Sequence, residues 1–439
     1  MDQRFATLRD SHVPETIVWY LVAFVGFIGA AIANERQPYS RAVLWAVAIG
    51  ARVALLFTTP TLSDDVYRYL WDGHLVASGV NPYRFAIADP AGDPYEIAAR
   101  ALANNPDLSS PYLPVANLVF AALALVTPAM SLAVQVTVLQ AAMVVLDLVT
   151  AALLAIALRL AGLPRHRLLL WLWNPLVIVE IAHGAHLDAL MLVLFADGLI
   201  AQLRSPMEAG APALTALATL TRPVPGFAAI ALLPLWSWRQ RGIYVGTLVA
   251  FCVPFGLAAG FGLESPPTGT GLFGSARVYS DTFRFNSALY QSLEARLSDP
   301  QLVQGLAAVA FAGIAVFTLW RAWQRREADG LSAVRLIAVP VVGYVVLTPV
   351  FHPWYLLIIV LLAIFWTPTG EESAYRWLHL VPLGWLAATV VFSYLTYLDP
   401  NAHAELTWVR RLQWWPTLAL AVIAAGVWHS RRGRERVAA

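Results

Sequence analysis

The residues best suited to chemistry lie in one short stretch, Ser63-Asp-Asp-Val-Tyr-Arg-Tyr-Leu-Trp-Asp72. This pattern predicts a helix capped by Ser63, with Asp64 and Asp65 in its first turn and Gly79 near its C-terminal end. A carboxylate at the mouth of a membrane cavity can act as a general base for a hydroxyl, which attacks poorly until its proton is removed. A structural alternative stays open, because acids in a first turn also complement the helix dipole.

The faces of this predicted helix carry two further expectations. Helical spacing brings Arg68 close to Asp72, so the two residues can form a plain ion pair. Apolar side chains such as Leu70 would let the helix lie along a membrane interface, with its tyrosines and Trp71 at the level of the lipid head groups.

The elements that must position these carboxylates are apolar. Of the 439 residues, 59% are hydrophobic and only 13% are charged, which is about half the charged share of a soluble domain. This composition excludes a soluble globular protein, a disordered chain, a coiled coil and a protein that binds nucleic acid. We therefore expect an integral membrane protein, in which the few charges away from the loops are costly and tend to be functional.

Apolar runs long enough to cross a bilayer recur along the whole chain. The stretches 112–128 and 211–235 are ambiguous, and we interpret both as re-entrant or hairpin elements, the second broken at Arg222. The sequence thus predicts an all-α polytopic protein with about 11 to 13 transmembrane helices, forming one domain over 1–439. The clear runs are 16–33, 42–58, 132–160, 168–182, 186–203, 243–262, 301–323, 332–350, 354–368, 376–397 and 412–429.

The charged residues orient these helices. Arginines gather in short segments that should face the cytoplasm. The acidic segment after the second span should face the other side, together with a second long loop and His352. The first extracytoplasmic loop is thus 59–111 and the second is 263–300, both with short interfacial helices, and the N-terminus is external. The arginines are Arg36, Arg41, Arg165, Arg167, Arg239, Arg241, Arg321, Arg325, Arg326, Arg431, Arg432, Arg434 and Arg436, and the acids are Asp64, Asp65, Asp72, Asp89, Asp93, Glu96 and Asp107.

The acidic string, followed by Gly79-Val-Asn-Pro-Tyr83, resembles the first extracytoplasmic loop of membrane glycosyltransferases of the C-type fold (GT-C). It is most similar to bacterial mannosyltransferases that use polyprenyl-phosphate-mannose. The resemblance implies that an Asp at the start of the loop is the base, and Asp64 fits that position best. Asp65 would then orient the acceptor or bind a divalent cation.

Later motifs follow the order of the same family. Thr221-Arg-Pro223 matches a position where relatives carry Lys or Arg, and an arginine fork suits a lipid phosphate. The resemblance and the surrounding sequence give a set of donor-phosphate or substrate-binding candidates. They are Arg222, His352 and Tyr355 of the late Pro-Trp-Tyr motif, Arg52, Arg68, Asn174 of the Asn-Pro run, His186 and Asp188.

Several of these candidates have structural alternatives. Arg222 can simply reach the interface, and His186 or Asp188 can hydrogen-bond within the fold, where Glu180 and Asp188 need partners such as His183 and His186. Arg52 can neutralise Asp64 or Asp65, or reach the donor phosphate, and Asp147 is expected to join helices. The loop 279–287 is either a lid, an acceptor platform or an interfacial loop.

The resemblance implies an inverting enzyme in a bacterial inner membrane, with its site on the extracytoplasmic side. By this resemblance the donor is a polyprenyl-phosphate sugar, with mannose as the expected sugar, and the acceptor is a glycan or glycolipid. No cofactor is implied beyond an optional divalent cation at Asp64 and Asp65, and no structural metal site is expected, because His183 and His186 lack a fourth ligand. A lipid or solute transporter and a polysaccharide polymerase or ligase remain the alternatives.

Overall fold

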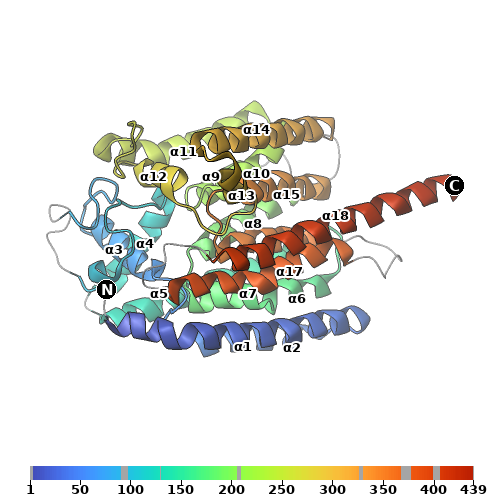
Figure 1. Cartoon of the computed structure of the whole chain (residues 1–439), viewed down its shortest axis with the longest axis horizontal. Helices are drawn as coiled ribbons and strands as arrows, with labels where there is room; N and C mark the ends of the chain where they lie inside the picture. The colour runs from blue at the N-terminus through green and yellow to red at the C-terminus, as the bar shows by residue number, and fades with distance from the viewer. Residues whose placement is uncertain are drawn as a thin grey trace.

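The computed structural model is a bundle of helices that run along one long axis (Figure 1). It describes residues 3–89, 97–128, 130–204, 209–325, 330–366, 377–398 and 406–438. Within these ranges the chain is all α-helical and holds no strand, only an isolated bridge between Phe285 and Val350. Of the residues that the sequence analysis used, Asp93, Glu96 and Arg326 lie outside the described part, as do the side chains of Arg431, Arg432, Arg434 and Arg436.

Eighteen α-helices are present in the described residues. They are α1 (Gln3–Arg36), α2 (Arg41–Leu55), α3 (Asp65–Ala77), α4 (Pro114–Val126), α5 (Leu132–Leu160), α6 (Leu169–Leu172), α7 (Pro175–Ile178), α8 (Asp188–Arg204), α9 (Gly210–Thr219), α10 (Val224–Leu232), α11 (Trp238–Ala259), α12 (Gly274–Thr282), α13 (Tyr290–Leu297), α14 (Pro300–Gln324), α15 (Gly330–Leu347), α16 (Leu356–Trp366), α17 (Val381–Thr389) and α18 (Thr407–Ala438).

Six helical segments of the described chain are long and apolar enough to cross a membrane. Side chains on the outside of the bundle remain apolar, as at Val25 on α1 and Val309 on α14, which are 72% and 71% exposed. Such a surface suits lipid and not water. The prediction of an all-α polytopic membrane protein is confirmed, whereas the total of about 11 to 13 crossings stays a prediction. The six are 12–36, 132–160, 238–259, 300–324, 330–347 and 381–398.

The ambiguous stretches form short helices. The first is α4, whose 13 residues give a length of about 20 Å, too short to cross the hydrocarbon core unaided. The second is the pair α9 and α10, which contact each other and are separated by Leu220–Pro223. Arg222 therefore sits in a break between two half-helices, where the sequence placed it.

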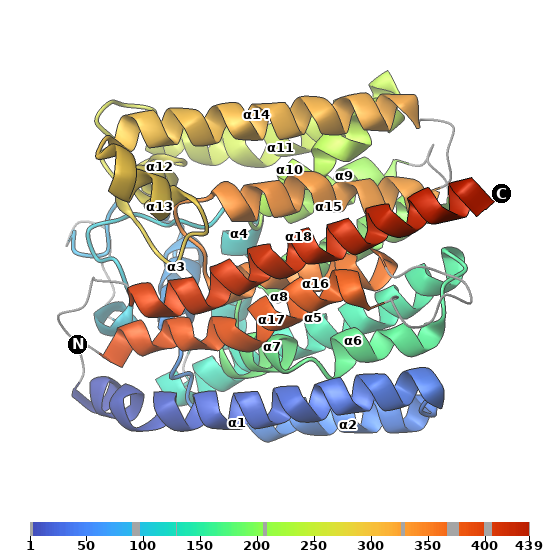
Figure 2. The ribbon, with the colours of Figure 1, turned by 45° about the vertical axis from the view of Figure 1, so that its right-hand side comes forward.

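Both loops expected outside lie at one end of the bundle. Helices α3 and α12 occupy the same end as the N-terminal end of α1, whereas the turn between α1 and α2 and the C-terminal end of α18 lie at the other (Figures 1 and 2). The arginine-bearing turn after Arg36 is thus at the end opposite to the acidic helix. This arrangement agrees with the expected sidedness, which itself stays a prediction.

Helix α3 of the first loop is packed against the protein. Tyr69 and Trp71 on α3 are each only 1% exposed, and α3 packs closely on α4. A Cβ on Gly73 would lie 2.5 Å from the backbone oxygen of Phe120, so only glycine allows this approach. The expectation that the tyrosine and tryptophan side chains of α3 lie among lipid head groups is wrong, because they are buried and join α3 to the helix bundle. The depth of α3 in the membrane stays a prediction.

Candidate active site

The two carboxylates at the start of α3 share one amide. Asn104 donates from Nδ2 to Oδ1 of Asp64 at 2.9 Å and to Oδ1 of Asp65 at 2.7 Å. Ser63 does not cap α3 as expected: its Oγ accepts the N–H of Asp65 at 3.2 Å, and the helix begins at Asp65. The Asn104 bridge holds the two negative groups close together and fixes their direction.

Arg68 positions the loop that carries Asn104. Its Nε lies 3.1 Å from Oδ1 of Asp72, which is the ion pair expected from helical spacing. The rest of the guanidinium donates to the backbone oxygens of Asn104, Asn105 and Leu108 at 3.0 to 3.4 Å. Burial raises the pKa of Asp72, and Arg68 acts in the opposite direction. The structure thus ties Arg68 to the loop and not to an open phosphate site.

Asp65 faces the interior of the bundle. Its Oδ2 lies 3.5 Å from the hydroxyl of Tyr69 and 3.9 Å from Nδ1 of His186. The same Tyr69 hydroxyl accepts the backbone N–H of Leu187 at 3.4 Å, so it joins α3 to the turn before α8. Tyr69 is held by stacking on Phe120, with ring centroids 4.6 Å apart.

His186 lies between two acids. Its Nε2 is 3.3 Å from Oε2 of Glu180, and the Tyr394 hydroxyl donates to both Glu180 oxygens at 2.8 and 2.9 Å. A π-helical turn, Val179–His183, and a tight turn at Gly184 create this proximity. A Cβ on Gly184 would lie 2.8 Å from both the Glu180 carbonyl and the His186 ring. Such π-turns frequently mark functional sites.

Arg222 pairs with Asp188 at the start of α8. Its Nε lies 3.0 Å from Oδ2 of Asp188, and the guanidinium carbon lies 5.9 and 6.0 Å from the ring centres of Tyr112 and Trp354. The expected partner of Asp188 was a histidine, but its partner is Arg222, whereas the expected pairing of Glu180 with His186 is present. The break between α9 and α10 therefore brings the arginine to the end of the bundle that holds α3.

Four rings form a continuous stack from the second loop to the acids. Phe285 lies on His352 with centroids 4.7 Å apart, His352 lies on Trp354 at 4.4 Å, and Trp354 lies on His186 at 4.0 Å. Backbone bonds from Phe285 to Pro349 and Phe351 fix the outer end of the stack. Tyr355 borders the same region, within electrostatic range of Arg222.

Buried polar atoms without a hydrogen bond gather here. In the described part of the chain they include Nη2 of Arg222, Nδ1 of His352 and Nε1 of Trp354, whereas the ring nitrogens of His186 have only the longer contacts with Glu180 and Asp65. Buried polar groups are paired in nearly all folded proteins, so unpaired ones on neighbouring side chains indicate a place for a ligand. Since the set includes a guanidinium and an indole N–H, which are donors, the site suits an anion such as a phosphate.

The second loop covers the acids from outside. Its helix α12 is joined to the first loop by Ser275, whose Oγ donates to the Ser109 carbonyl at 2.8 Å. Burial raises the pKa of Tyr279, and the charges of Asp65 and Asp64 raise it further, so the hydroxyl lies within electrostatic range of the carboxylates. The position of α12 favours a cover or platform over a plain interfacial loop.

Two expected site residues lie elsewhere. Arg52 does not neutralise Asp64 or Asp65, because its Nε contacts Asp147 and its Nη1 donates to the Leu172 carbonyl at 2.9 Å. Asp147 therefore joins helices, as expected. Asn174 caps α7, with its Oδ1 accepting the N–H of Leu176 at 3.0 Å, so its side chain serves the broken helix.

The positions of the acidic, histidine and cysteine side chains bear on metal binding. Among the residues that the structure describes, no group of three or more His, Cys, Asp or Glu side chains lies close enough to hold a metal ion. His183 does not join His186 in such a group, and instead its ring nitrogens contact Thr58 and Thr61 at 2.9 to 3.2 Å. An optional cation at Asp64 and Asp65 would have to compete with the Asn104 amide.

Sequence reasoning missed Asn104 and Tyr394. Asn104 lies in a loop 39 residues after Asp65, and Tyr394 lies 214 residues after Glu180. No motif or period signals either position in a single sequence, because each acts only through a contact made by the fold.

Comparison with known proteins bears on this geometry. The family described as α-(1→6)-mannopyranosyltransferase, N-terminal domain, matches residues 11–238, which is more than half of the chain and contains α3, His186 and Arg222. The chain belongs to this family. It is also similar to α-(1→6)-mannopyranosyltransferase A of Mycobacterium tuberculosis, with 25% identity over 448 aligned positions that cover 87% of this chain and 79% of that protein.

Membership of this mannosyltransferase family confirms the recognition made from the acidic loop and the later motifs. It also decides between an enzyme and a lipid or solute transporter, because the family is described as one of mannosyltransferases. The protein is a membrane-embedded glycosyltransferase of the mannosyltransferase type.

Proposed function

We propose that the protein transfers mannose from a polyprenyl-phosphate-mannose donor to a hydroxyl of a glycan or glycolipid, on the extracytoplasmic side of a bacterial inner membrane. The observation that carries this proposal is the juxtaposition of a carboxylate pair with unpaired donors around Arg222 and Trp354. The first suits proton removal from an acceptor, and the second suits the phosphate of a departing lipid. The family match supports mannose and an α-(1→6) linkage.

The chemistry is one direct displacement. The acceptor oxygen attacks the anomeric carbon of mannose and forms the new glycosidic bond, while the bond from that carbon to the phosphate oxygen breaks. The configuration at the anomeric carbon inverts, the acceptor proton moves to a carboxylate, and polyprenyl phosphate leaves with the electron pair. Arg222 stabilises the negative charge that develops on the leaving phosphate, and His352 and Tyr355 border the same place.

The geometry favours Asp65 as the base. The family pattern favours Asp64, but Asp65 is the acid that lies beside His186 and Tyr69 and acts electrostatically on Asp188 and Tyr112. Asp64 shares the Asn104 amide and keeps Asp65 oriented. A base must lie within reach of the reacting hydroxyl, and Asp65 faces the Arg222 region where the donor phosphate would lie.

The test is transfer by the purified full-length protein in lipid nanodiscs, with polyprenyl-phosphate-mannose and an α-(1→6)-mannobiose glycoside. We expect Asp65→Asn to lower kcat by about 1,000-fold, within the range of general-base effects, and Asp64→Asn to lower it by about tenfold. The matched control is Asp89→Asn, which changes another acid of the same loop, in a turn where the Asp89 N–H bonds the Ala86 carbonyl. This variant should keep full turnover. Full turnover in both site variants would falsify the base assignment, and absence of mannose transfer by the wild type would refute the proposed function.

A further inference from the structure

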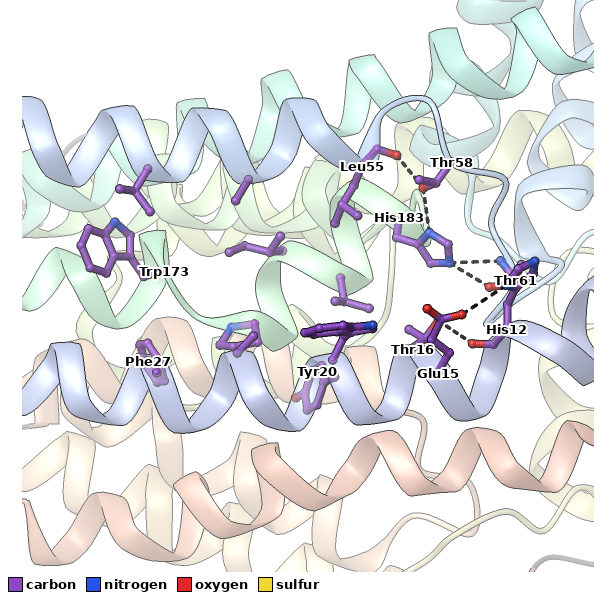
Figure 3. A pocket seen from close by; sticks show the side chains of 18 of the residues that line it. His12, Glu15, Thr16, Tyr20, Phe27, Leu55, Thr58, Thr61, Trp173 and His183 are labelled. Carbon is purple, nitrogen blue, oxygen red and sulfur yellow. Dashed lines mark hydrogen bonds and ion pairs between the residues drawn. The ribbon is translucent and has the colours of Figure 1, made fainter.

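A groove of about 830 Å³ lies apart from the cluster around Arg222. It runs between α1, α2 and the segment of α7 with its π-helical turn (Figure 3). One face of α1 lines it at helical spacing, through Tyr20, Ala23, Phe27 and Ala30, and α2 contributes Val47, Ala51 and Leu55. Between Glu15 and Phe27 this face extends for about 18 Å, so the groove has the length and apolar walls of a hydrocarbon-chain site.

The two ends of the groove differ. His12, Glu15 and Thr16 of α1 meet Thr61 and His183 at one end, whereas Phe27 and Trp173 lie toward the other (Figure 3). The polar end presents hydroxyls, imidazoles and one carboxylate. None of the described residues that line the groove is an arginine. A phosphate would meet the Glu15 carboxylate, whose contact with a basic side chain here is His12 at 3.9 Å, with no arginine to offset the repulsion, whereas an uncharged head group rich in hydroxyls would find both donors and acceptors.

The polar end is continuous with the catalytic loop. His183 accepts the backbone N–H of Thr61 at 3.2 Å through Nε2, and its Nδ1 lies 2.9 Å from the Thr58 hydroxyl. Thr61 precedes Asp64 by three residues, and His183 precedes His186 by three. A head group held at this end would therefore lie beside the segments that carry the carboxylates and their histidine.

We propose that this groove binds the lipid chain of the acceptor, a glycolipid whose uncharged, hydroxyl-rich head group lies against Glu15, Thr61 and His183. The inference rests on the proposed function and adds a second lipid site to it. In this arrangement the donor phosphate binds near Arg222, and the acceptor lipid binds in the groove along α1. Separate sites for two lipids let both substrates remain in the membrane while only the reacting hydroxyl meets the anomeric carbon.

The first test uses two glycines of α1, of which one lines the groove and the other does not. A Cβ at Gly26 or at Gly29 would meet no atom within 4 Å, but Gly26 lines the groove and Gly29 does not. We compare Gly26→Trp with Gly29→Trp on two acceptors with the same α-(1→6)-mannobiose, one a dialkylglycerol glycoside and one a methyl glycoside. Gly26→Trp should raise KM for the lipid acceptor about tenfold and leave the methyl glycoside and the donor unchanged, and Gly29→Trp should change none of them.

Two results would overturn the inference alone: an effect of Gly26→Trp on the KM of the donor, or equal effects on the two acceptors. Activity with the methyl glycoside shows that the variant is folded. If the wild type transfers mannose to neither acceptor, the proposed function fails, and this outcome differs from both of the others.

The second test identifies the occupant directly. A photoactivatable dialkylglycerol mannoside in nanodiscs should label peptides of α1 that contain Tyr20 or Phe27, and unlabelled mannoside should displace it. Displacement by polyprenyl phosphate at the same concentration would assign the groove to the donor. Equal displacement by phosphatidylcholine would show an ordinary bilayer lipid only, and either result overturns the proposal.

Discussion

Two arginine–aspartate pairs in this bundle have the same chemistry and different surroundings. In the pair Arg52–Asp147, the arginine also bonds two backbone carbonyls, and the second carboxylate oxygen accepts the Trp171 indole at 2.8 Å. In the pair Arg222–Asp188, the contact is 3.0 Å, yet Nε and Nη2 of the arginine make no well-directed hydrogen bond. Arg52 leaves only its Nη2 without a hydrogen bond, whereas Arg222 leaves both Nε and Nη2 and lies beside the unpaired indole N–H of Trp354. Burial and pairing alone therefore do not separate a structural charge from a functional one, whereas a cluster of unused donors does.

The comparison predicts first a large loss of stability at the Arg52–Asp147 pair, which makes more hydrogen bonds than the other. Asp147→Ala leaves Arg52 buried without its counter-ion, which costs about 3–5 kcal/mol of unfolding free energy. Thermal unfolding in nanodiscs measures it. The double variant Arg52→Met with Asp147→Leu should recover most of the loss. The comparison breaks if Asp188→Ala, at the other pair, destabilises the protein as much as Asp147→Ala.

Substitution of Arg222 should lower donor turnover by more than its effect on folding explains, although it also leaves the buried Asp188 carboxylate without its counter-ion. Arg222→Gln removes the charge that meets the leaving phosphate, and we expect kcat/KM for the donor to fall by about 100-fold, close to 3 kcal/mol. Arg222→Lys keeps the charge without the fork and should recover only part of it. Initial rates at varied donor concentration measure both. Unchanged donor kinetics in Arg222→Gln would place the phosphate elsewhere.

The acid behind His186 should have a smaller effect. Glu180→Gln keeps the shape of the side chain and its contact with Tyr394 but weakens its hold on His186. We expect kcat to fall by about tenfold, less than the roughly 10²–10⁴-fold of a direct general base because Glu180 acts only through His186, with KM for the donor unchanged. The matched control is Glu294→Gln, whose partner Arg284 is partly exposed and whose loss should be barely measurable. Equal effects of the two substitutions would contradict a role for Glu180 behind the base.

The smallest effect is expected above the carboxylates. Tyr279→Phe removes a hydroxyl within electrostatic range of Asp64 and Asp65 and keeps the ring stacked on Phe283 at 4.0 Å. We expect KM for the acceptor to rise by about threefold, the value of one neutral hydrogen bond, with KM for the donor unchanged. A change in the donor constant instead would place α12 over the phosphate and not over the acceptor.

The apolar runs predicted the bundle because a bilayer imposes a minimum length on each crossing segment. The helix after Ser63 and the break at Arg222 were also predicted. Acidic residues follow Ser63 and a proline follows Arg222, and both interrupt the apolar sequence. The expected exposure of the α3 aromatic side chains to head groups was wrong for a physical reason. Tyrosine and tryptophan suit a head-group layer and a buried helix contact equally well, and a single sequence does not distinguish the two.

Charge partners were harder to predict than helices. Arg52 stands only 12 residues before Asp64, but the fold gives it Asp147, 95 residues away, because a charge at membrane depth takes the carboxylate that the packing brings to it. Asp188 likewise takes Arg222 in place of a neighbouring histidine. In contrast, Arg68 and Asp72 were predicted correctly because their contact depends only on the helical repeat.

The stack of Phe285, His352, Trp354 and His186 has a consequence for the order of events. Closely packed rings move together, so a shift of the second loop at Phe285 would change the position of the His186 ring relative to Asp65. On the proposed function, the base would be aligned only when the outer loop is closed over an acceptor. Water that enters an empty site would then meet a misaligned carboxylate, and the activated donor would be protected from hydrolysis.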